Sequence, residues 1–329
     1  MWKEGFSLPE ARNSSGSSPT VRRRELGALL RALRNERGLT VDQVAAELLC
    51  SPSKVSRMET GHRGATARDI RDLCELYGVA DPAERSRLAS LAAEGKRQGW
   101  WQTYELDYFA TYVGLEEAAT AMRQYQSTVV PGLLQTPDYA RAMAEVLEVG
   151  PGRVDELVEV KLRRQHLLAA KPSVPLSVII DEAVLHRLVG GSQAMSDQLQ
   201  YLIDVTESSN VTIQVVPYSV GAHPAMESTF AILDFGEPVP SVVYVEGLVG
   251  FLYLERPQDI TRYEHVFDRL RHIALSPQES IKLIAEVGVA HSRAFSDAVG
   301  NRLTLRNPSG SLSTSYNGTP FLGDNYQCL

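Results

Sequence analysis

Cysteine is scarce in this chain, and long hydrophobic runs are missing. The 329 residues include three cysteines, Cys50, Cys74 and Cys328, whose odd number and wide spacing favour neither a disulfide framework nor a zinc site. No apolar run approaches the roughly 18 residues that a membrane-spanning helix needs. The first 20 residues also lack the hydrophobic segment of a secretory signal. We therefore expect a cytoplasmic protein that contacts no membrane.

The motifs that usually mark catalysis are also missing. The sequence has no His-Glu-x-x-His zinc motif, no cysteine pair, no glycine-rich phosphate loop and no Gly-x-Ser-x-Gly nucleophile elbow. The segment from Gly247 to Gly250 predicts a turn and not a cofactor fingerprint. We therefore expect no catalytic residue, no cofactor and no metal site, and an enzyme is the least favoured functional class.

Acidic residues outnumber basic ones, but not in every part of the chain. The formal net charge is −7, yet residues 1–98 carry 17 Lys and Arg against 13 Asp and Glu, while the remainder carries 16 against 27. Phosphate attracts the first part and repels the second. If the chain binds double-stranded DNA, we therefore expect the contact in the first part only.

Length and local composition predict several domains. A chain of 329 residues, 43% of them hydrophobic, suggests two or three domains with sizeable cores. We predict a multidomain protein, with an all-α helix-turn-helix N-terminal domain followed by an α+β C-terminal domain. Composition and hydrophobic period give the boundaries: a disordered leader over 1–20, the helix-turn-helix domain over 21–95, an α+β regulatory or partner-binding domain over 96–289, and a flexible tail over 290–329.

The stretch from Thr40 to Gly61 predicts two short helices joined by a tight turn. Val55 and Met58, three residues apart, form the inward face of the second helix. Ser51 as N-cap followed by Pro52 at the first helical position is a strong start signal. Burying Val55 and Met58 leaves a short, polar and basic outer face, and such a helix fits the major groove of DNA.

We expect nine residues around this helix to contact DNA. Base readout is expected from Ser53, Lys54 and Arg57, because Pro52 cannot read a base edge. Hydroxyl, amide and cationic groups beside a recognition helix usually fix its register on the phosphate backbone. The alternative is an exposed helix of a protein–protein module. The predicted contacts are Thr40, Gln43, Ser51, Ser53, Lys54, Ser56, Arg57, His62 and Arg63.

The residues LRNERGLTVDQVAAELLCSPSKVSRMETG resemble the lambda-repressor/Cro (XRE) type of helix-turn-helix domain. The resemblance runs from about Glu25 to Val79 and implies a bacterial DNA-binding regulator. It departs at Leu49, a turn position usually held by glycine, which predicts either a less comfortable backbone or a shifted turn. One short helix offers few base contacts, so we expect a homodimer on paired half-sites.

The pattern of the second domain changes between helical and strand periods. A helical pattern that includes Leu115 and Met122 falls within residues 104–126. Trp100 and Trp101 are too costly to leave exposed, and we expect them to dock into this domain. Helices are expected over 154–169, 192–208 and 258–274 and from 276 to about 287, and a helix of the first domain over 25–36. The segment 176–185 is expected to begin as a buried strand, and further strands are expected over 211–218, 229–235, 241–248 and 250–255.

Asp181, Glu182, His223 and Glu246 lie at predicted strand ends, and such positions can converge on a pocket mouth. We predict a ligand or partner pocket at Glu182, His223 and Glu246. A metal site or a general base is the disfavoured alternative, because no catalytic motif accompanies these residues.

The landmarks PGLLQTPDYARA, LRRQHLL and FDRLRHIALSPQESIKLI resemble the C-terminal domain of actinobacterial antitoxin-like transcriptional regulators, the WhiJ-type group. The resemblance runs from about Tyr104 to Ile284. It implies control of development or secondary metabolism, and a small toxin-like partner protein encoded nearby. Two hypotheses follow. The first is a sequence-specific DNA-binding regulator, associated with the nucleoid when bound, whose second domain binds a partner or ligand. The alternative is an antitoxin-like module that neutralises the partner and autoregulates its own operon.

Overall fold

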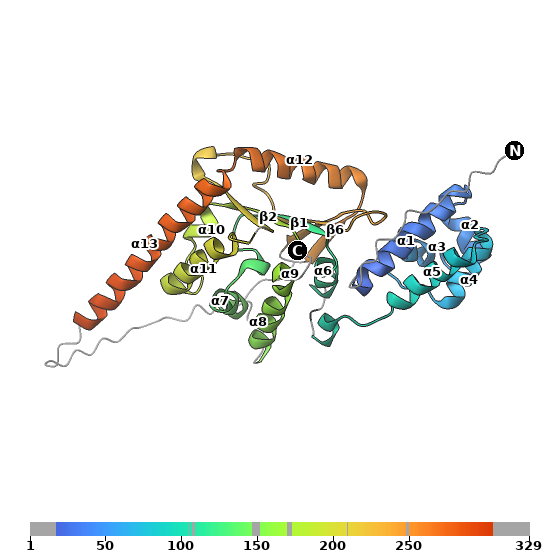
Figure 1. The fold of residues 1–329 in the computed structure, drawn as a ribbon, viewed down its shortest axis with the longest axis horizontal. Coiled ribbons are helices and arrows are strands. Elements are labelled where there is room, and N and C mark those ends of the chain that lie inside the picture. Colours follow the sequence, from blue (N-terminus) through green and yellow to red (C-terminus); the bar gives the residue numbers. More distant parts are fainter. Residues whose placement is uncertain are drawn as a thin grey trace, which may run out of the picture.

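The computed structural model describes residues 18–304, apart from residues 105, 107, 108, 147–151, 170–172, 209, 248 and 249. Figure 1 shows a helical N-terminal domain, blue to cyan, beside a larger domain built around a sheet. The predicted fold class is confirmed, since an all-α domain precedes an α+β domain. In the described ranges, no helix is both long enough and apolar enough to cross a bilayer.

Five helices form the first domain, and each starts at a side chain that caps it. Ser18, Thr40, Ser51, Thr66 and Asp81 accept a backbone N–H from the first turn of the helix that follows. The inward residues of these helices share one buried apolar cluster. The helices are α1 (Pro19–Glu36), α2 (Val41–Glu47), α3 (Pro52–Glu59), α4 (Ala67–Leu76) and α5 (Pro82–Glu94).

The first helix begins earlier than the sequence predicts. The prediction of a disordered leader to residue 20 and a helix from Glu25 is wrong, because α1 starts at Pro19. Ser18-Pro19 is the same start signal as the Ser-Pro pair of α3, but it ends a stretch rich in Ser and Gly whose composition is typical of disorder. Residues 1–17 of the predicted leader lie outside the described residues.

A six-stranded mixed sheet organises the second domain. The strand order is β3-β2-β1-β4-β5-β6. Neighbouring strands pair in parallel from β3 to β1 and antiparallel from β1 to β6. Helical crossovers join the parallel strands, as that connection requires. The strands are β1 (Ala121–Gln126), β2 (Leu176–Asp181), β3 (Val211–Val216), β4 (Phe230–Asp234), β5 (Val242–Gly247) and β6 (Gly250–Leu254).

Helices cover both faces of this sheet (Figure 1). On one face, Phe267 and Leu270 of α12 join a cluster with Tyr125 of β1. On the other, residues of α6, α7, α11 and α13 share the largest cluster with strand residues such as Met122. The helices are α6 (Phe109–Glu116), α7 (Pro137–Val146), α8 (Arg153–Arg164), α9 (His166–Ala169), α10 (Ala183–His186), α11 (Gly191–Val205), α12 (Pro257–Ile273) and α13 (Pro277–Thr304), with short 3-10 turns at Trp100–Thr103, Gly132–Leu134 and Tyr218–Val220.

Two predictions for the second domain need correction. The helical pattern within residues 104–126 is wrong at its end, because Ala121–Gln126 is the strand β1. Its sequence, AMRQYQ, is half polar and shows neither a clean apolar alternation nor an apolar run. The segment 176–185 begins as a strand, as predicted, and β2 gives way to α10 after Asp181. The tail predicted from residue 290 is helical as far as Thr304, and residues 305–329 lie outside the described part.

Helices α1 and α6 join the two domains. The Ser18 hydroxyl donates a hydrogen bond to the Gly114 carbonyl. Val21 is buried in the same cluster as Tyr112 of α6. A Cβ atom on Gly114 would lie 2.4 Å from the Thr20 hydroxyl oxygen, so the close approach of α1 to α6 requires glycine.

Polar and aromatic contacts extend this junction. The Arg24 guanidinium donates to the Glu255 carboxylate, with 2.8 Å between nitrogen and oxygen. Trp101 is buried in a cluster with Val113 of α6 and Val160 of α8. The expected docking of this tryptophan into the second domain is therefore confirmed.

Candidate nucleic-acid interface

The turn between α2 and α3 contains a strained residue. Leu49 adopts a positive φ of 48°, and it is the only non-glycine among the described residues that does so. Its side chain is 94% exposed. Left-handed backbone is unfavourable for a residue with a Cβ. Of the two alternatives predicted for this turn, the structure has the less comfortable backbone.

The inward face of helix α3 packs closely against α1. Val55 and Met58 are buried, as predicted. Helix α1 packs directly against the backbone of α3, because a Cβ on Gly27 of α1 would lie 2.5 Å from the Glu59 carbonyl oxygen. Arg34 of α1 donates two hydrogen bonds to the Glu59 carboxylate, at 2.7 and 2.9 Å. This buried bidentate pair fixes the C-terminal end of α3 relative to α1.

The outer face of α3 is polar and exposed. Ser53, Ser56 and Arg57 are all exposed. Arg57 forms no ion pair within the described part of the chain, so its guanidinium is available to an external anion. Ser51 is exposed and caps the helix by accepting the Lys54 N–H at 3.2 Å. Its hydroxyl proton remains available for a phosphate oxygen.

Lys54 is the exception among the predicted base contacts. Its ammonium donates to the Asp69 carboxylate at 2.6 Å, and 24% of its side chain is exposed. Burial would raise the pKa of Asp69, but hydrogen bonds from Lys54 and Thr66 outweigh that effect and lower it. The structure therefore directs Lys54 toward α4 and leaves Arg57 as the unpaired cation of α3. The prediction treated Lys54 as an outward-facing group, because the sequence spacing does not reveal the carboxylate 15 residues away.

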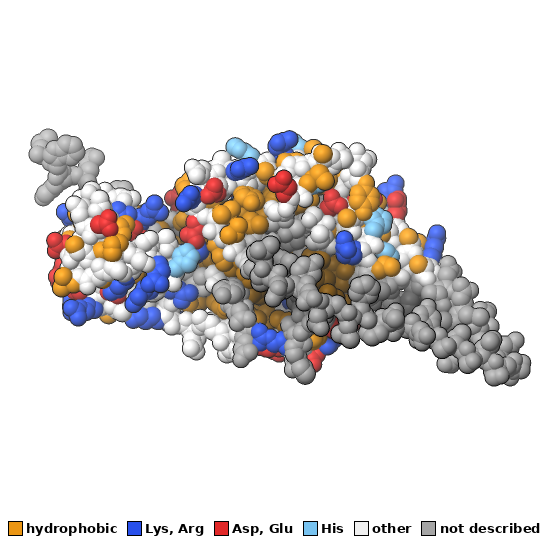
Figure 2. Space-filling view, turned by 180° about the vertical axis from the view of Figure 1, so that it is seen from behind, with side chains coloured by type: hydrophobic (Ala, Val, Ile, Leu, Met, Phe, Trp, Pro, Cys, Tyr) orange, Lys and Arg blue, Asp and Glu red, His pale blue; other side chains and the backbone are white. Residues whose placement is uncertain are grey.

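The residues predicted to contact phosphate lie on exposed segments before α2, at its start and after α3. Thr40 and Gln43 form a reciprocal capping box, in which each side chain accepts the backbone N–H of the other. The Gln43 amide nitrogen is left to donate elsewhere. His62 and Arg63 follow α3 and are exposed. Figure 2 shows several basic side chains, in blue, on the visible face of this domain.

The structure does not unite the residues predicted to form a pocket. Asp181 and His223 lie 3.6 Å apart, and His223 also contacts the Tyr125 hydroxyl on the α12 side of the sheet. Glu182 accepts the Tyr218 N–H at 2.7 Å. Glu246, on β5, lines a separate cavity. The predicted pocket at Glu182, His223 and Glu246 is wrong as one site, because β1 and β4 separate β2 from β5 by three strand spacings, roughly 14 Å.

A capped α2-turn-α3 unit with an exposed polar helix face defines a helix-turn-helix DNA-binding protein. The comparison with known families agrees, since the model described as a helix-turn-helix domain matches residues 25–88. A second model, described as a domain of unknown function (DUF5753), matches residues 109–286. This match covers more than half of the chain, and the chain belongs to the DUF5753 family. No curated protein and no solved structure matched.

The sequence reading missed two polar partners that shape α3. Asp69 belongs to a capping box with Thr66, and the Thr-x-x-Asp spacing is a signal that could have marked it. Arg34 lies on α1 beside the apolar stripe, and its buried position was not evident from the period alone. Both residues act on α3 through long-range contacts.

Proposed function

We propose that this protein is a sequence-specific transcriptional regulator in which α3 reads operator DNA. The observation that carries the proposal is the exposed row of Ser53, Ser56 and Arg57 on a helix clamped from behind by Arg34 and Gly27. A rigid helix with an outward cation and hydroxyls can enter a major groove without rearranging. The match of the helix-turn-helix family supports this proposal.

The finer features of the proposal follow from chemistry and from the resemblance. Since α3 offers few base-reading groups, the regulator acts as a homodimer on paired half-sites. It works in the cytoplasm, associated with the nucleoid when bound. Its targets are genes of development or secondary metabolism, and the second domain binds a ligand or a small partner protein.

The test is the selection of binding sites by the full-length chain from a pool of random DNA duplexes. Arg57→Ala should weaken binding to the selected site by about 5- to 150-fold and should make the salt dependence less steep if Arg57 faces phosphate. Arg269→Ala, which removes one exposed cation from α12, is the matched control and should bind as the unaltered chain does. Failure to enrich any sequence, or equal affinity of the Arg57→Ala protein, would contradict the proposal.

The antitoxin-like alternative predicts a different result when the protein is purified from the bacterium that produces it. Purification of the full-length chain would then recover a small protein in equimolar amount, and DNA binding would be restricted to the promoter of its own operon. Enrichment of many unrelated operators without a stoichiometric protein partner would favour the regulator.

A further inference from the structure

A cavity of about 500 Å³ lies between the sheet and helices α6, α7 and α8. This volume falls within the range of small-molecule sites. Aromatic rings line one wall as a continuous series. Ring centroids are 5.4 Å apart for Phe109 and Tyr112, 4.3 Å for Tyr112 and Tyr244, and 5.5 Å for Tyr244 and Phe251. A wall of aromatic rings favours an aromatic ligand that can pack against it.

Polar groups project into the same cavity from several elements. Lys161 of α8 donates to the Gln135 side chain at 2.7 Å, and Gln124 of β1 donates to the Tyr112 hydroxyl at 3.2 Å. Glu246 of β5 lies at the exposed rim. A mainly apolar cavity with a few convergent polar groups has the composition of a ligand site.

Among the described residues that line this cavity, Lys161 is a cation that lacks a close carboxylate. Arg164 is fully committed, since it donates two hydrogen bonds to Glu116, at 2.6 and 2.7 Å. Lys161 forms no ion pair among the described residues and hydrogen-bonds only a neutral amide. Burial and the nearby Arg164 lower the pKa of Lys161 to about 8, against an opposing effect of Glu246. An anionic group beside Lys161 would supply the missing counter-charge.

The buried hydroxyl of Tyr244 is a second unsatisfied group in the wall. It has no hydrogen-bond partner within the described part of the chain, although Tyr244 is only 5% exposed. Burial raises the pKa of Tyr244, so this hydroxyl stays protonated at neutral pH. A polar ligand atom that reached it would remove an unfavourable desolvation.

Helix α6 connects this cavity to the DNA-binding domain. Phe109 and Tyr112 of α6 line the cavity, while Gly114 of the same helix accepts the hydrogen bond from Ser18 of α1. Tyr112 also shares a buried cluster with Val21 of α1. A ligand that moves or orders α6 therefore acts on the helix that positions α3.

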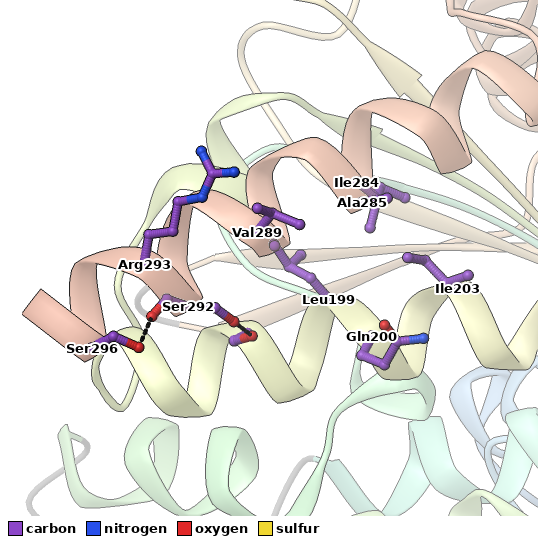
Figure 3. A pocket seen from close by; sticks show the side chains of 11 residues that line it. Leu199, Gln200, Ile203, Ile284, Ala285, Val289, Ser292, Arg293 and Ser296 are labelled. Carbon is purple, nitrogen blue, oxygen red and sulfur yellow. Dashed lines mark hydrogen bonds between the residues drawn. The ribbon is translucent and has the colours of Figure 1, made fainter.

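A second depression, between α11 and α13, has a different character. It encloses about 450 Å³ and is shown in Figure 3. Its hydroxyls are already paired, since the Ser196 and Ser292 oxygens are 2.6 Å apart and Ser296 donates to the Ser292 carbonyl. Leu199 and Ile284 from the two helices are fully buried beside it. The described residues that line this helix–helix groove include no aromatic ring, and the groove provides a control site.

We propose that the cavity between the sheet and α6–α8 is an effector site for a planar aromatic molecule that carries an anionic group, and that α6 transmits its occupancy to α1. The ligand lies on the rings of Tyr112 and Tyr244 with its anion toward Lys161. The consequence for DNA binding rests on the proposed function, whereas ligand binding itself does not.

The first test measures binding of 8-anilinonaphthalene-1-sulfonate, an aromatic sulfonate, to the full-length chain by fluorescence titration. We expect one site per chain. Lys161→Met, which removes the cation, and Ala144→Trp, which fills the cavity, should each weaken binding at least tenfold. Ala285→Trp fills the α11–α13 groove and should leave it unchanged. Equal binding by all four proteins, or loss only in Ala285→Trp, would overturn the assignment.

The second test measures amide hydrogen exchange with and without the same probe. Binding should slow exchange in residues 109–116 and also in residues 22–27 of α1. Ser18→Ala combined with Val21→Ala should keep the effect on α6 and lose the effect on α1. Unchanged exchange of α1 in the unaltered chain would overturn the coupling. Because neither test includes DNA, a chain that binds the probe but no operator would contradict the proposed function and leave the cavity assignment standing.

Discussion

The two candidate sites place their polar side chains in opposite ways. On α3, Ser53, Ser56 and Arg57 point outward and are exposed. In the second domain, Gln124 and Arg164 are buried beside a cavity and bonded to neighbours. Exposed polar groups stay hydrated in the free protein, so they can contact the surface of a large polyanion such as DNA. Inward groups lose water on folding and must be paired within the protein or by a ligand.

A buried Arg–Glu pair nevertheless lies beside each of the two sites, and the two pairs differ in depth. The side chains of Arg34 and Glu59 are 11% and 5% exposed, and those of Arg164 and Glu116 are 4% and 0% exposed. The first pair joins α1 to α3 near the domain surface. The second joins α8 to α6 at the cavity wall. The deeper pair should be the more sensitive to loss of one partner.

The largest effect is expected from a substitution that breaks this deeper pair. Glu116→Ala leaves Arg164 charged and buried without a counter-ion, and we expect a loss of about 3–5 kcal/mol in the free energy of unfolding. Urea unfolding followed by tryptophan fluorescence reports it, because Trp101 is buried in the same domain. Asp155→Ala breaks the exposed pair with Arg141 and should cost less than about 1 kcal/mol. Similar losses in both variants would contradict the contrast in depth.

A pH series tests the buried charge of Lys161 in the second domain. The pKa of Lys161 is lowered to about 8 by burial and by Arg164, whereas the unfolded chain keeps the ordinary value of 10.5. Above pH 8 the folded state releases this proton first, so stability rises with pH until the unfolded chain also deprotonates. Relative to Lys161→Met, the chain should gain at most about 3 kcal/mol between pH 7 and 10.

Chemical denaturation of both proteins at each pH measures this difference. The ionisation of tyrosines is common to both and cancels. A constant difference across the series would mean that Lys161 is charged in the folded state throughout.

A pair of glycine substitutions tests the packing of the two domains. Gly27→Ala places a methyl group against the backbone of α3, and we expect a loss of about 1–3 kcal/mol. Gly288→Ala lies inside α13, where the nearest atom, the Leu199 Cβ, is 3.6 Å away. It should gain about 0.5–1 kcal/mol from helix propensity. Thermal unfolding by far-ultraviolet circular dichroism distinguishes these opposite signs, and a gain in Gly27→Ala would refute the close contact.

The smallest expected effect concerns the turn before α3. Leu49→Gly removes an exposed side chain and relieves the positive φ, so we expect a gain of about 0.5–1 kcal/mol. Leu188→Gly removes another exposed leucine where no positive φ exists, and it should not stabilise the chain. Thermal unfolding of the two variants checks this, and a destabilised Leu49→Gly protein would argue against strain at the turn.

The sequence predicted the helical domain well, because its signals are local. The cap at Ser51 acts within one turn, and the structure places it as expected. The central strand β1 was missed for the opposite reason. Its pairing with β2 and β4 spans more than 50 and 100 residues of chain, and its polar residues interrupt the apolar pattern of a strand.

The candidate sites show the same division. Exposure of Arg57 follows from burying Val55 and Met58 on the same short helix, and the structure agrees. The pairing of Lys54 with Asp69 joins two helices and could not be read from spacing. The cavity draws residues from α6, β1, α8 and β5, of which the sequence marked Glu246 alone. Its other members, such as Lys161 and Tyr112, gain meaning only once the chain is folded.

The burial of Val21 in the sheet-containing domain has a practical consequence for anyone dividing this chain. A C-terminal fragment that begins after α5 would contain every strand of the sheet. It would still lack the first turn of α1, whose Val21 packs in one cluster with Tyr112 and Leu115. It would expose apolar surface that the intact polypeptide keeps dry, and it would lose the Ser18 donor to Gly114. The boundary seen along the sequence is therefore not a boundary in space, and truncated versions should aggregate more readily than the whole.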